Sequence, residues 1–146
     1  MGSHLVKLEQ EALALMNSGK KEQAVELFSA IIKQRPDWEH GLTFFNLAGC
    51  LEDLGQLEQA EQSYQRAIKY GPGNPIIWGG YASFLYLHGD PQDAFEAHLK
   101  LLRLERACCS EPSSEQVETI TIALTSLADK LGMSREDLNE QIERAI

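Results

Sequence analysis

The sequence has no long apolar stretch, few cysteines and a shortage of positive charge. Its 146 residues contain 13 Lys and Arg against 22 Asp and Glu, which gives a formal net charge of −9. No apolar run approaches the roughly 20 residues that a helix needs to cross a bilayer. An acidic chain also repels phosphate backbones and anionic lipid. We therefore expect a soluble, single-domain cytoplasmic protein that binds neither membranes nor nucleic acid.

The cysteines and histidines form no pattern typical of a disulfide framework or a metal site. Cys50 stands alone and Cys108 is adjacent to Cys109. Small secreted domains carry an even set of spaced cysteines, and zinc sites need ligand pairs such as CxxC. The four histidines are scattered along the chain. We expect free thiols in a reducing compartment, with no metal and no other cofactor.

The sequence also lacks the residue patterns of catalysis. It has no glycine-rich phosphate loop and no HExxH pair. Cys50 lies among leucines with nothing nearby to lower the pKa of its thiol. Asp90 and Asp93 stand where a helix should begin, and carboxylates there cap backbone N–H groups. We expect no catalytic residues and no enzyme.

What the sequence does contain is a repeat of about 34 residues. Equivalent positions are separated by 36 and then by 34 residues. They are Gly19, Gly55 and Gly89; Ala24, Ala60 and Ala94; Phe28, Tyr64 and His98; and Leu8, Phe44 and Trp78. Because every column shares the longer first step, two extra residues must lie between Pro36 and Phe44. We place them around Glu39 and His40.

Each repeat has the pattern of two helices. In the second unit, apolar residues recur at steps of three and four from Leu42 to Leu54, where Gly55 should end the helix. A second apolar stripe starts at Leu57, and Gly71 begins a Gly-Pro-Gly turn that should end it. The pair Gly79-Gly80 falls inside a predicted helix of the third unit. It predicts either close helix packing or an open groove floor.

The units resemble tetratricopeptide repeats, whose pattern is W-x2-L-G-x2-Y, then A-x3-F, then P. The matching residues are Leu8, Ala12, Leu15, Gly19, Ala24, Phe28, Ile31 and Pro36 in the first unit (5–38); Phe44, Leu47, Ala48, Leu51, Gly55, Ala60, Tyr64, Ala67 and Pro72 in the second (41–74); and Trp78, Tyr81, Ala82, Leu85, Gly89 and Ala94 in the third (75–108). The third unit departs from the pattern at His98, Leu101 and Arg106, which puts the regularity of its second helix in doubt.

The two ends of the chain lie outside this pattern. Residues 1–4 resemble a cloning scar, so we leave them out of the fold assignment. Residues 109–146 should form a linker and a capping helical hairpin, because a last repeat left uncovered exposes an apolar face. Possible capping boxes at Ser113 with Gln116, and at Ser134 with Asp137, mark the two helix starts.

The resemblance implies an all-α fold, a right-handed superhelix or α-solenoid of helix-turn-helix repeats. It also implies a non-enzymatic protein–protein interaction module, a scaffold or adaptor that binds a peptide or helix of a partner in a concave groove. In the family, the first helix of each pair lines that groove. The positions that the family uses correspond here to Val6, Glu9, Gln10, Leu13, Asn17, Leu42, Phe45, Asn46, Gly49, Asp53, Ile76, Gly79, Gly80, Ser83 and Leu87.

This groove lacks the clamp with which some family members hold the C-terminal carboxylate of heat-shock chaperones. Only Asn46 matches that clamp, and its other positions hold Glu9, Leu13, Ile76 and Gly80. A carboxylate there would meet Glu9 and no cation, so its charge-assisted hydrogen bonds would be lost. We therefore expect a different partner, such as an apolar peptide or amphipathic helix flanked by basic residues.

Several alternatives stay open from the sequence. The apolar groove positions could simply pack between helices or against the C-terminal hairpin. The protein could be a chaperone that shields a hydrophobic client segment, or a regulatory domain of a larger enzyme. A weak homodimer through Trp78, Phe84 and Tyr86 is a further possibility. Negative charge is concentrated in residues 37–72, with 2 basic and 6 acidic residues, and in residues 113–146, with 3 and 7.

Overall fold

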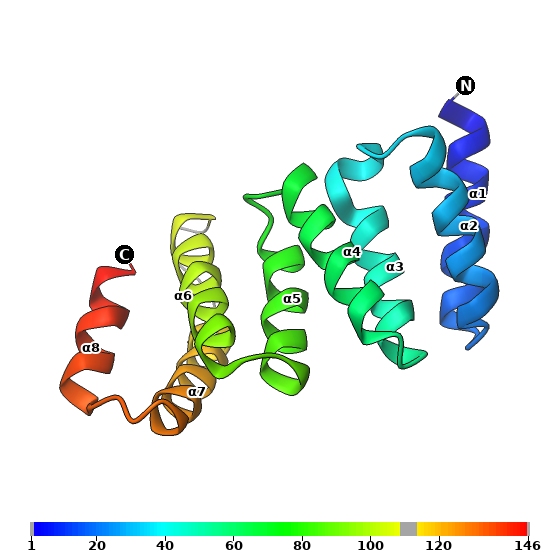
Figure 1. Cartoon of the computed structure of the whole chain (residues 1–146). Helices are drawn as coiled ribbons and strands as arrows, with labels where there is room; N and C mark the ends of the chain where they lie inside the picture. Colours follow the sequence, from blue (N-terminus) through cyan, green and yellow to red (C-terminus); the bar gives the residue numbers. More distant parts are fainter. Residues whose placement is uncertain (1, 109–113, 146) are drawn as a thin grey trace. The chain divides into compact units, whose positions relative to one another are not determined.

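A computed structural model describes residues 2–108 and 114–145 of the chain. Within these residues the backbone forms eight α-helices and one short 3₁₀ turn, with no strand (Figure 1). The all-α prediction is therefore confirmed. The helices fall into two compact units, residues 1–72 and residues 73–146. No helix in the described ranges is both long enough and apolar enough to cross a membrane.

Unit 1 contains two helix pairs joined by a short turn. Its elements are α1 (Gly2–Asn17), α2 (Lys21–Gln34), η1 (Trp38–Gly41), α3 (Leu42–Asp53) and α4 (Leu57–Tyr70). Helix α1 packs on α2, α2 on α3, and α3 on α4. Residues 2–4, which resemble a cloning scar in sequence, lie in the first turn of α1.

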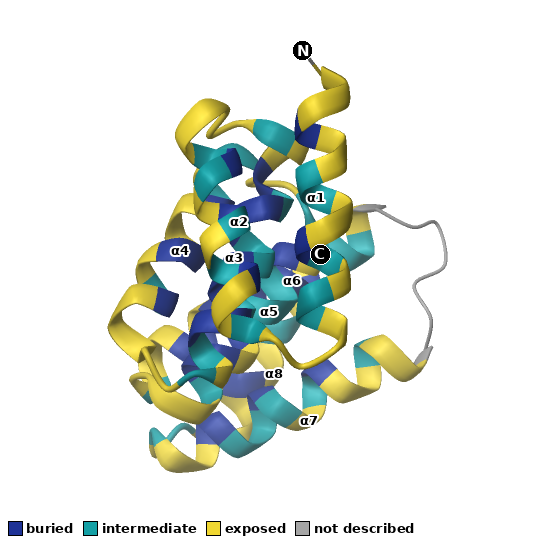
Figure 2. Ribbon diagram, turned by 90° about the vertical axis from the view of Figure 1, so that its right-hand side faces the viewer, coloured by how far each residue is buried: buried dark blue, intermediate teal, exposed yellow. Residues whose placement is uncertain are grey.

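The core of unit 1 follows the three- and four-residue spacing of the sequence. Ala24, Ala60 and Ala67 are fully buried, and their small side chains allow neighbouring helices to approach closely. Phe28 is fully buried beside them and Tyr64 nearly so. Buried positions alternate with exposed ones along the helices, as amphipathic packing requires (Figure 2).

The connection from α2 to α3 contains the two additional residues that the repeat arithmetic predicts. Glu39 and His40 both have left-handed backbone angles, with φ of 55° and 51°. Such angles are uncommon for residues with a side chain. The two additional residues thus form part of a compact turn between α2 and α3, and neither helix contains them.

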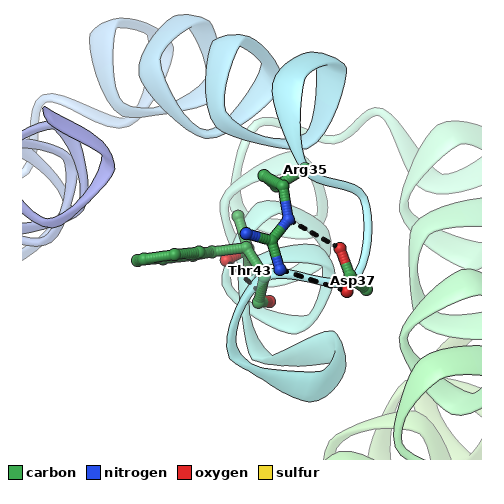
Figure 3. A network of polar contacts seen from close by, with 4 residues as sticks. Arg35, Asp37 and Thr43 are labelled. Carbon is green, nitrogen blue, oxygen red and sulfur yellow. Dashed lines mark hydrogen bonds and ion pairs between the residues drawn. The ribbon is translucent and has the colours of Figure 1, made fainter. Parts of the chain in front are cut away.

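Polar contacts hold this connection in place (Figure 3). Arg35 donates from Nε and Nη2 to the two carboxylate oxygens of Asp37, at 3.1 and 3.3 Å. These hydrogen bonds lower the pKa of the Asp37 carboxyl below its usual value. The Thr43 hydroxyl donates to the carbonyl oxygen of Trp38 at 3.4 Å, which links the turn to the first residues of α3.

Unit 2 contains the four remaining helices. They are α5 (Pro75–His88), α6 (Pro91–Cys108), α7 (Ser114–Lys130) and α8 (Arg135–Arg144). Helix α5 packs on α6, α6 on α7, and α7 on α8. Side-chain caps start three of these helices. They are Asn74, which accepts from the N–H of Ile76; Asp90, which accepts from that of Gln92; and Ser134, which accepts from that of Asp137.

The predicted helix starts at Asp90 and Ser134 are therefore confirmed. The other predicted start, at Ser113, lies outside the described residues. The N-cap carboxylate of Asp90 is followed by a proline at the first helical position, where a missing N–H costs nothing.

The third unit's departures from the repeat pattern do not disturb α6. This helix is regular and spans 18 residues, whereas α2 and α4 each span 14. With Arg106 in place of a proline, nothing stops the helix at that point. The Arg106 guanidinium instead donates to the carbonyl oxygen of Ile142 at 2.9 Å, near the negative end of α8.

Candidate functional site: an apolar cleft in unit 2

A cleft of about 740 Å³ lies within unit 2, where α5, α6 and α7 meet. Its volume falls in the range of roughly 300–1,000 Å³ that is usual for ligand sites. The lining residues are Pro75, Ile76, Gly79, Ser83, Tyr86 and Leu87 from α5; His98, Leu101 and Glu105 from α6; and Glu115, Gln116, Thr119, Ile120, Ile122 and Ala123 from α7.

Three large apolar side chains of this cleft are unusually exposed to solvent. Ile76, Leu87 and Ile122 are 62, 68 and 64% exposed, more than any other large apolar side chain in the described ranges. Ile76 and Leu87 lie at the two ends of α5, and Ile122 lies on α7. Contiguous exposed apolar surface costs free energy in water and typically marks a site where another molecule binds. This cleft is the chain's strongest candidate for such a site.

Gly79 leaves the floor of the cleft open. A Cβ atom placed there would find only the Cδ1 atom of Leu101, at 4.0 Å, which is an ordinary van der Waals distance. Close helix packing therefore does not require glycine at this position. Of the two explanations that the sequence offers for the Gly79-Gly80 pair, the geometry at Gly79 favours the open floor.

One wall of the cleft is fixed by interactions of His98 and Tyr86. His98 is only 6% exposed, and its Nδ1–H donates to the Ala94 carbonyl oxygen at 2.7 Å. Its ring meets the Tyr86 ring edge-on, with centroids 6.2 Å apart. The Tyr86 hydroxyl and the Ser126 hydroxyl are 3.0 Å apart and share a hydrogen bond. Burial lowers the pKa of His98, which keeps the imidazole neutral near pH 7.

The charge along the cleft has one sign. Glu105 and Glu115 line it, and no Lys or Arg is among its lining residues. One cation contacts a wall residue, since the Nζ of Lys130 lies 5.1 Å from the centre of the Tyr86 ring. A ligand with basic groups beside an apolar segment fits this arrangement.

Four of the five groove residues predicted on α5 line this cleft. They are Ile76, Gly79, Ser83 and Leu87; Gly80 is not part of the lining. The ten predicted residues of unit 1 lie on α1 and α3, and none belongs to the buried core. Their role in binding stays a prediction.

Three of those unit 1 residues interact with neighbouring side chains. Glu9 accepts a hydrogen bond from the Trp38 indole at 2.9 Å. Asp53 forms an ion pair with Lys21 at 3.1 Å. The half-buried Phe45 ring meets the ring of the buried Tyr64, with centroids 6.1 Å apart. Asp53 is thus partly neutralised by a cation of the unit, whereas Glu9 keeps its charge and accepts from a neutral donor.

The contribution of α6 and α7 to the cleft is missing from the sequence prediction. Leu101, Glu105 and Ile122 come from helices that the repeat pattern does not assign to a groove. Ile122 carries a usable signal, because it lies two residues from Ile120 and from Leu124, which are both buried and define the core face of α7. An exposed isoleucine opposite the core face indicates a second contact surface.

Two of the three aromatic residues considered for self-association, Phe84 and Tyr86, make contacts within unit 2. Phe84 is buried, and Tyr86 shares its hydroxyl hydrogen bond with Ser126. This agrees with the alternative that repeat packing accounts for most of the group. Phe84 is therefore not available as a dimer contact.

The described residues offer no constellation for metal binding. No group of three or more His, Cys, Asp or Glu side chains is placed to hold an ion in the parts of the chain that the structure describes. Cys50 is buried, and burial raises the pKa of its thiol, which disfavours the reactive thiolate.

Comparison with known proteins identifies the repeats. Two family models described as tetratricopeptide repeat match residues 9–37 and 50–107, together more than half of the chain. Comparison with curated proteins gives no match.

Solved structures resemble the chain over most of its length. A type III secretion (T3SS) complex from Aeromonas hydrophila has a TM-score of 0.79 at 21% identity, covering 92% of this chain and 87% of the other. The Yersinia enterocolitica chaperone SycD, solved with a peptide of the translocator YopD, has a TM-score of 0.76 at 22% identity, with coverages of 88 and 95%. The TPR2B domain of yeast Sti1, in complex with pHsp70, has a TM-score of 0.73 at 15% identity, with coverages of 84 and 96%.

At such low identity the structural likeness concerns the fold, an α-helical repeat fold, which confirms the predicted fold class. The family models concern the sequence itself, and they cover the residues on which the repeat was recognised. The chain belongs to the tetratricopeptide-repeat family.

Proposed function

We propose that the protein is a non-enzymatic protein–protein interaction module that binds an apolar segment of a partner in the cleft of unit 2. One observation carries this proposal. The three most exposed large apolar side chains of the described residues, Ile76, Leu87 and Ile122, all line the same cleft. A partner that covers them removes apolar surface from water, which favours binding by roughly 25 cal/mol per Å².

The lining also defines the chemistry of the ligand. Apolar side chains along a bound segment would cover Ile76, Leu87 and Ile122, while Glu105 and Glu115 attract flanking Lys or Arg side chains. A C-terminal carboxylate would meet two carboxylates and no cation there. We therefore propose that the ligand is an apolar peptide or helix flanked by basic residues, and that it is not a chaperone C-terminal tail.

A chaperone role is the second candidate, and the same exposed apolar cleft favours it. SycD, which has a similar fold, is described as a type III secretion translocator chaperone and was solved with a YopD peptide. In this version the bound segment belongs to a client that is insoluble alone. Co-expression of this chain with the captured protein should then raise the soluble fraction of the captured protein. An unchanged soluble fraction would contradict the chaperone role and favour the adaptor role.

Site-specific photo-crosslinking tests the proposed binding site. A photoreactive amino acid replaces Leu87, and crosslinked peptides captured from source cells are identified by mass spectrometry. We expect a recurrent apolar segment with Lys or Arg on its flanks. A matched control places the same photoreactive residue at Leu57, an apolar residue of α4 that is 37% exposed and lines none of the pockets described here.

Two results would refute the site. One is crosslinking at position 57 with the same yield and the same partner as at position 87. The other is a recurrent partner segment at position 87 that is acidic or polar.

A further inference from the structure

Unit 1 contains a second pocket whose charge is opposite to that of the cleft. This pocket has a volume of about 430 Å³ and lies between α2 and α4, with Phe44 of α3 in its wall. Three of its lining residues are cations, namely Lys33, Arg66 and Lys69, and none of its lining residues is acidic. In a chain with a formal net charge of −9, three cations in one pocket are a marked local concentration.

None of these three cations forms an ion pair with another described residue. Within the described residues, Lys33 and Arg66 form no ion pair, and Lys69 contacts only the face of the Tyr70 ring, with Nζ 5.5 Å from its centre. Two other cations of unit 1 do have acidic partners, since Lys21 pairs with Asp53 and Arg35 with Asp37. Among the described residues, no acidic side chain thus forms an ion pair with a cation of this pocket.

An apolar wall accompanies the positive charge. The rings of Phe44 and Tyr70 stack in parallel, with centroids 5.8 Å apart and an angle of 2° between their planes. Phe44 is buried and Tyr70 half-buried, so the stack forms a supported wall beside the exposed cations. Ile32 extends this apolar surface. A ligand that fits both features carries negative charge next to an aromatic or aliphatic group.

We propose that this pocket binds an acidic peptide segment of a protein partner, with carboxylates around one aromatic or aliphatic side chain. Arg66 offers a planar guanidinium that can hold a carboxylate with two hydrogen bonds, and the lysines supply charge on either side. A single phosphate would leave the apolar wall uncovered, and a long nucleic acid would face the repulsion of the acidic chain. The site is separate from the cleft of unit 2 and does not depend on it.

Titration of the full ¹⁵N-labelled chain by NMR tests this site. The probe is the peptide acetyl-Glu-Glu-Phe-Glu-Glu-amide, and its uncharged analogue has Gln in place of every Glu. We expect the acidic peptide to shift the backbone amides around Lys33, Arg66 and Lys69, and the analogue to bind at least about tenfold more weakly. The double variant Lys33→Glu/Arg66→Glu should lose binding of the acidic peptide to the same extent.

A second double variant, Lys7→Glu/Lys20→Glu, is the matched control. It changes the net charge by the same amount at exposed lysines outside the pocket, so it should leave the affinity within about twofold of the wild type. Equal weakening by both double variants would overturn the proposal, because the effect would then come from net charge. Circular dichroism checks that each variant keeps its helical content.

Two further probes distinguish the source of the negative charge. Inorganic phosphate and a short single-stranded oligonucleotide are titrated at the same ionic strength as the peptide. Weak or absent shifts with both probes support an acidic peptide. Binding of either one at the same amides, as tight as the peptide's, would overturn the assignment to a protein segment.

Discussion

At the scale of single residues, Gly41 is a position where the fold has no room for a side chain. Its φ of 94° lies in the left-handed region, and a Cβ atom there would stand 2.4 Å from the carbonyl oxygen of Ala67. That contact is with backbone of α4, so no side-chain rotation relieves it. Gly41 therefore combines an unfavourable backbone angle with a steric requirement.

We predict that Gly41→Ala lowers the free energy of unfolding by more than about 2 kcal/mol. The control is Gly55→Ala, where φ is 79° but a Cβ atom meets nothing within 4 Å. Only the backbone strain applies there, which costs roughly 1 kcal/mol. Urea unfolding followed by circular dichroism measures both. Equal losses would show that the contact with Ala67 relaxes without cost.

His98 gives a pH dependence whose sign follows from its burial. Its pKa in the folded protein lies below the ordinary value of 6.5, so the unfolded chain takes up a proton more readily. The stability contributed by neutral His98 is present above about pH 6.5 and decreases as the pH falls towards the folded-state pKa. Replacing His98 with Phe, the residue type usual at this repeat position, removes that titration.

The expected result is a flatter stability profile for His98→Phe between about pH 7.5 and 5.5, a range above the titration of ordinary carboxyls. Chemical unfolding at a series of pH values measures it. The other histidines are unchanged between the two proteins, so they cancel in the comparison. Parallel profiles would contradict the assignment of a lowered pKa to His98.

At the scale of elements, α5 combines two glycines that weaken a helix with the proposed binding surface. Glycine in a helix interior costs about 1 kcal/mol relative to alanine. Gly79→Ala should therefore raise the free energy of unfolding by about 1 kcal/mol, because the added methyl group has room. The same methyl group would stand on the cleft floor, so we expect weaker binding of the partner segment.

Gly49→Ala in α3 is the control for this trade between stability and binding. A Cβ atom at Gly49 also meets nothing within 4 Å, and the residue is not part of the cleft. It should give a similar stability gain with no loss of binding to unit 2. Thermal unfolding and a binding titration on both variants separate the two effects. Unchanged binding by Gly79→Ala would mean that the ligand does not reach the cleft floor.

The helices themselves could be predicted because their signals are local. The apolar spacing predicts α3 and α4. Gly55 and Gly71 mark the ends of these two helices. The two-residue insertion at Glu39 and His40 follows from comparing repeats, although its left-handed angles do not. Helix α6 runs to Cys108 because the residue that would stop it is absent.

The cleft could be predicted only in part, because it depends on contacts between helices that are distant in sequence. The face of α5 follows from the family pattern, and two of the residues predicted on it, Ile76 and Leu87, lie in the lining. The opposite wall depends on how α6 and α7 pack, which no repeat template describes. The place of Glu105 in the cleft therefore becomes visible only in the folded unit, whereas Ile122 is marked in the sequence by its position opposite the core face.

At the scale of the whole molecule, the cleft of unit 2 and the pocket of unit 1 carry charges of opposite sign. The cleft of unit 2 contains two glutamates and no cation, whereas the pocket of unit 1 contains three cations and no acid. The formal net charge of −9 conceals this difference. The two proposed sites therefore call for partner segments of opposite charge, each beside an apolar group.

The central claim, that the cleft of unit 2 holds a partner's apolar segment, is tested most directly by the affinity of a synthetic peptide. The peptide is the segment identified by crosslinking at position 87, and its Kd is measured for wild type, Leu87→Glu and Leu57→Glu. The account predicts at least about tenfold weaker binding for Leu87→Glu, because a charge replaces an apolar contact of the cleft, and no change for Leu57→Glu. Equal affinities for wild type and Leu87→Glu would contradict it.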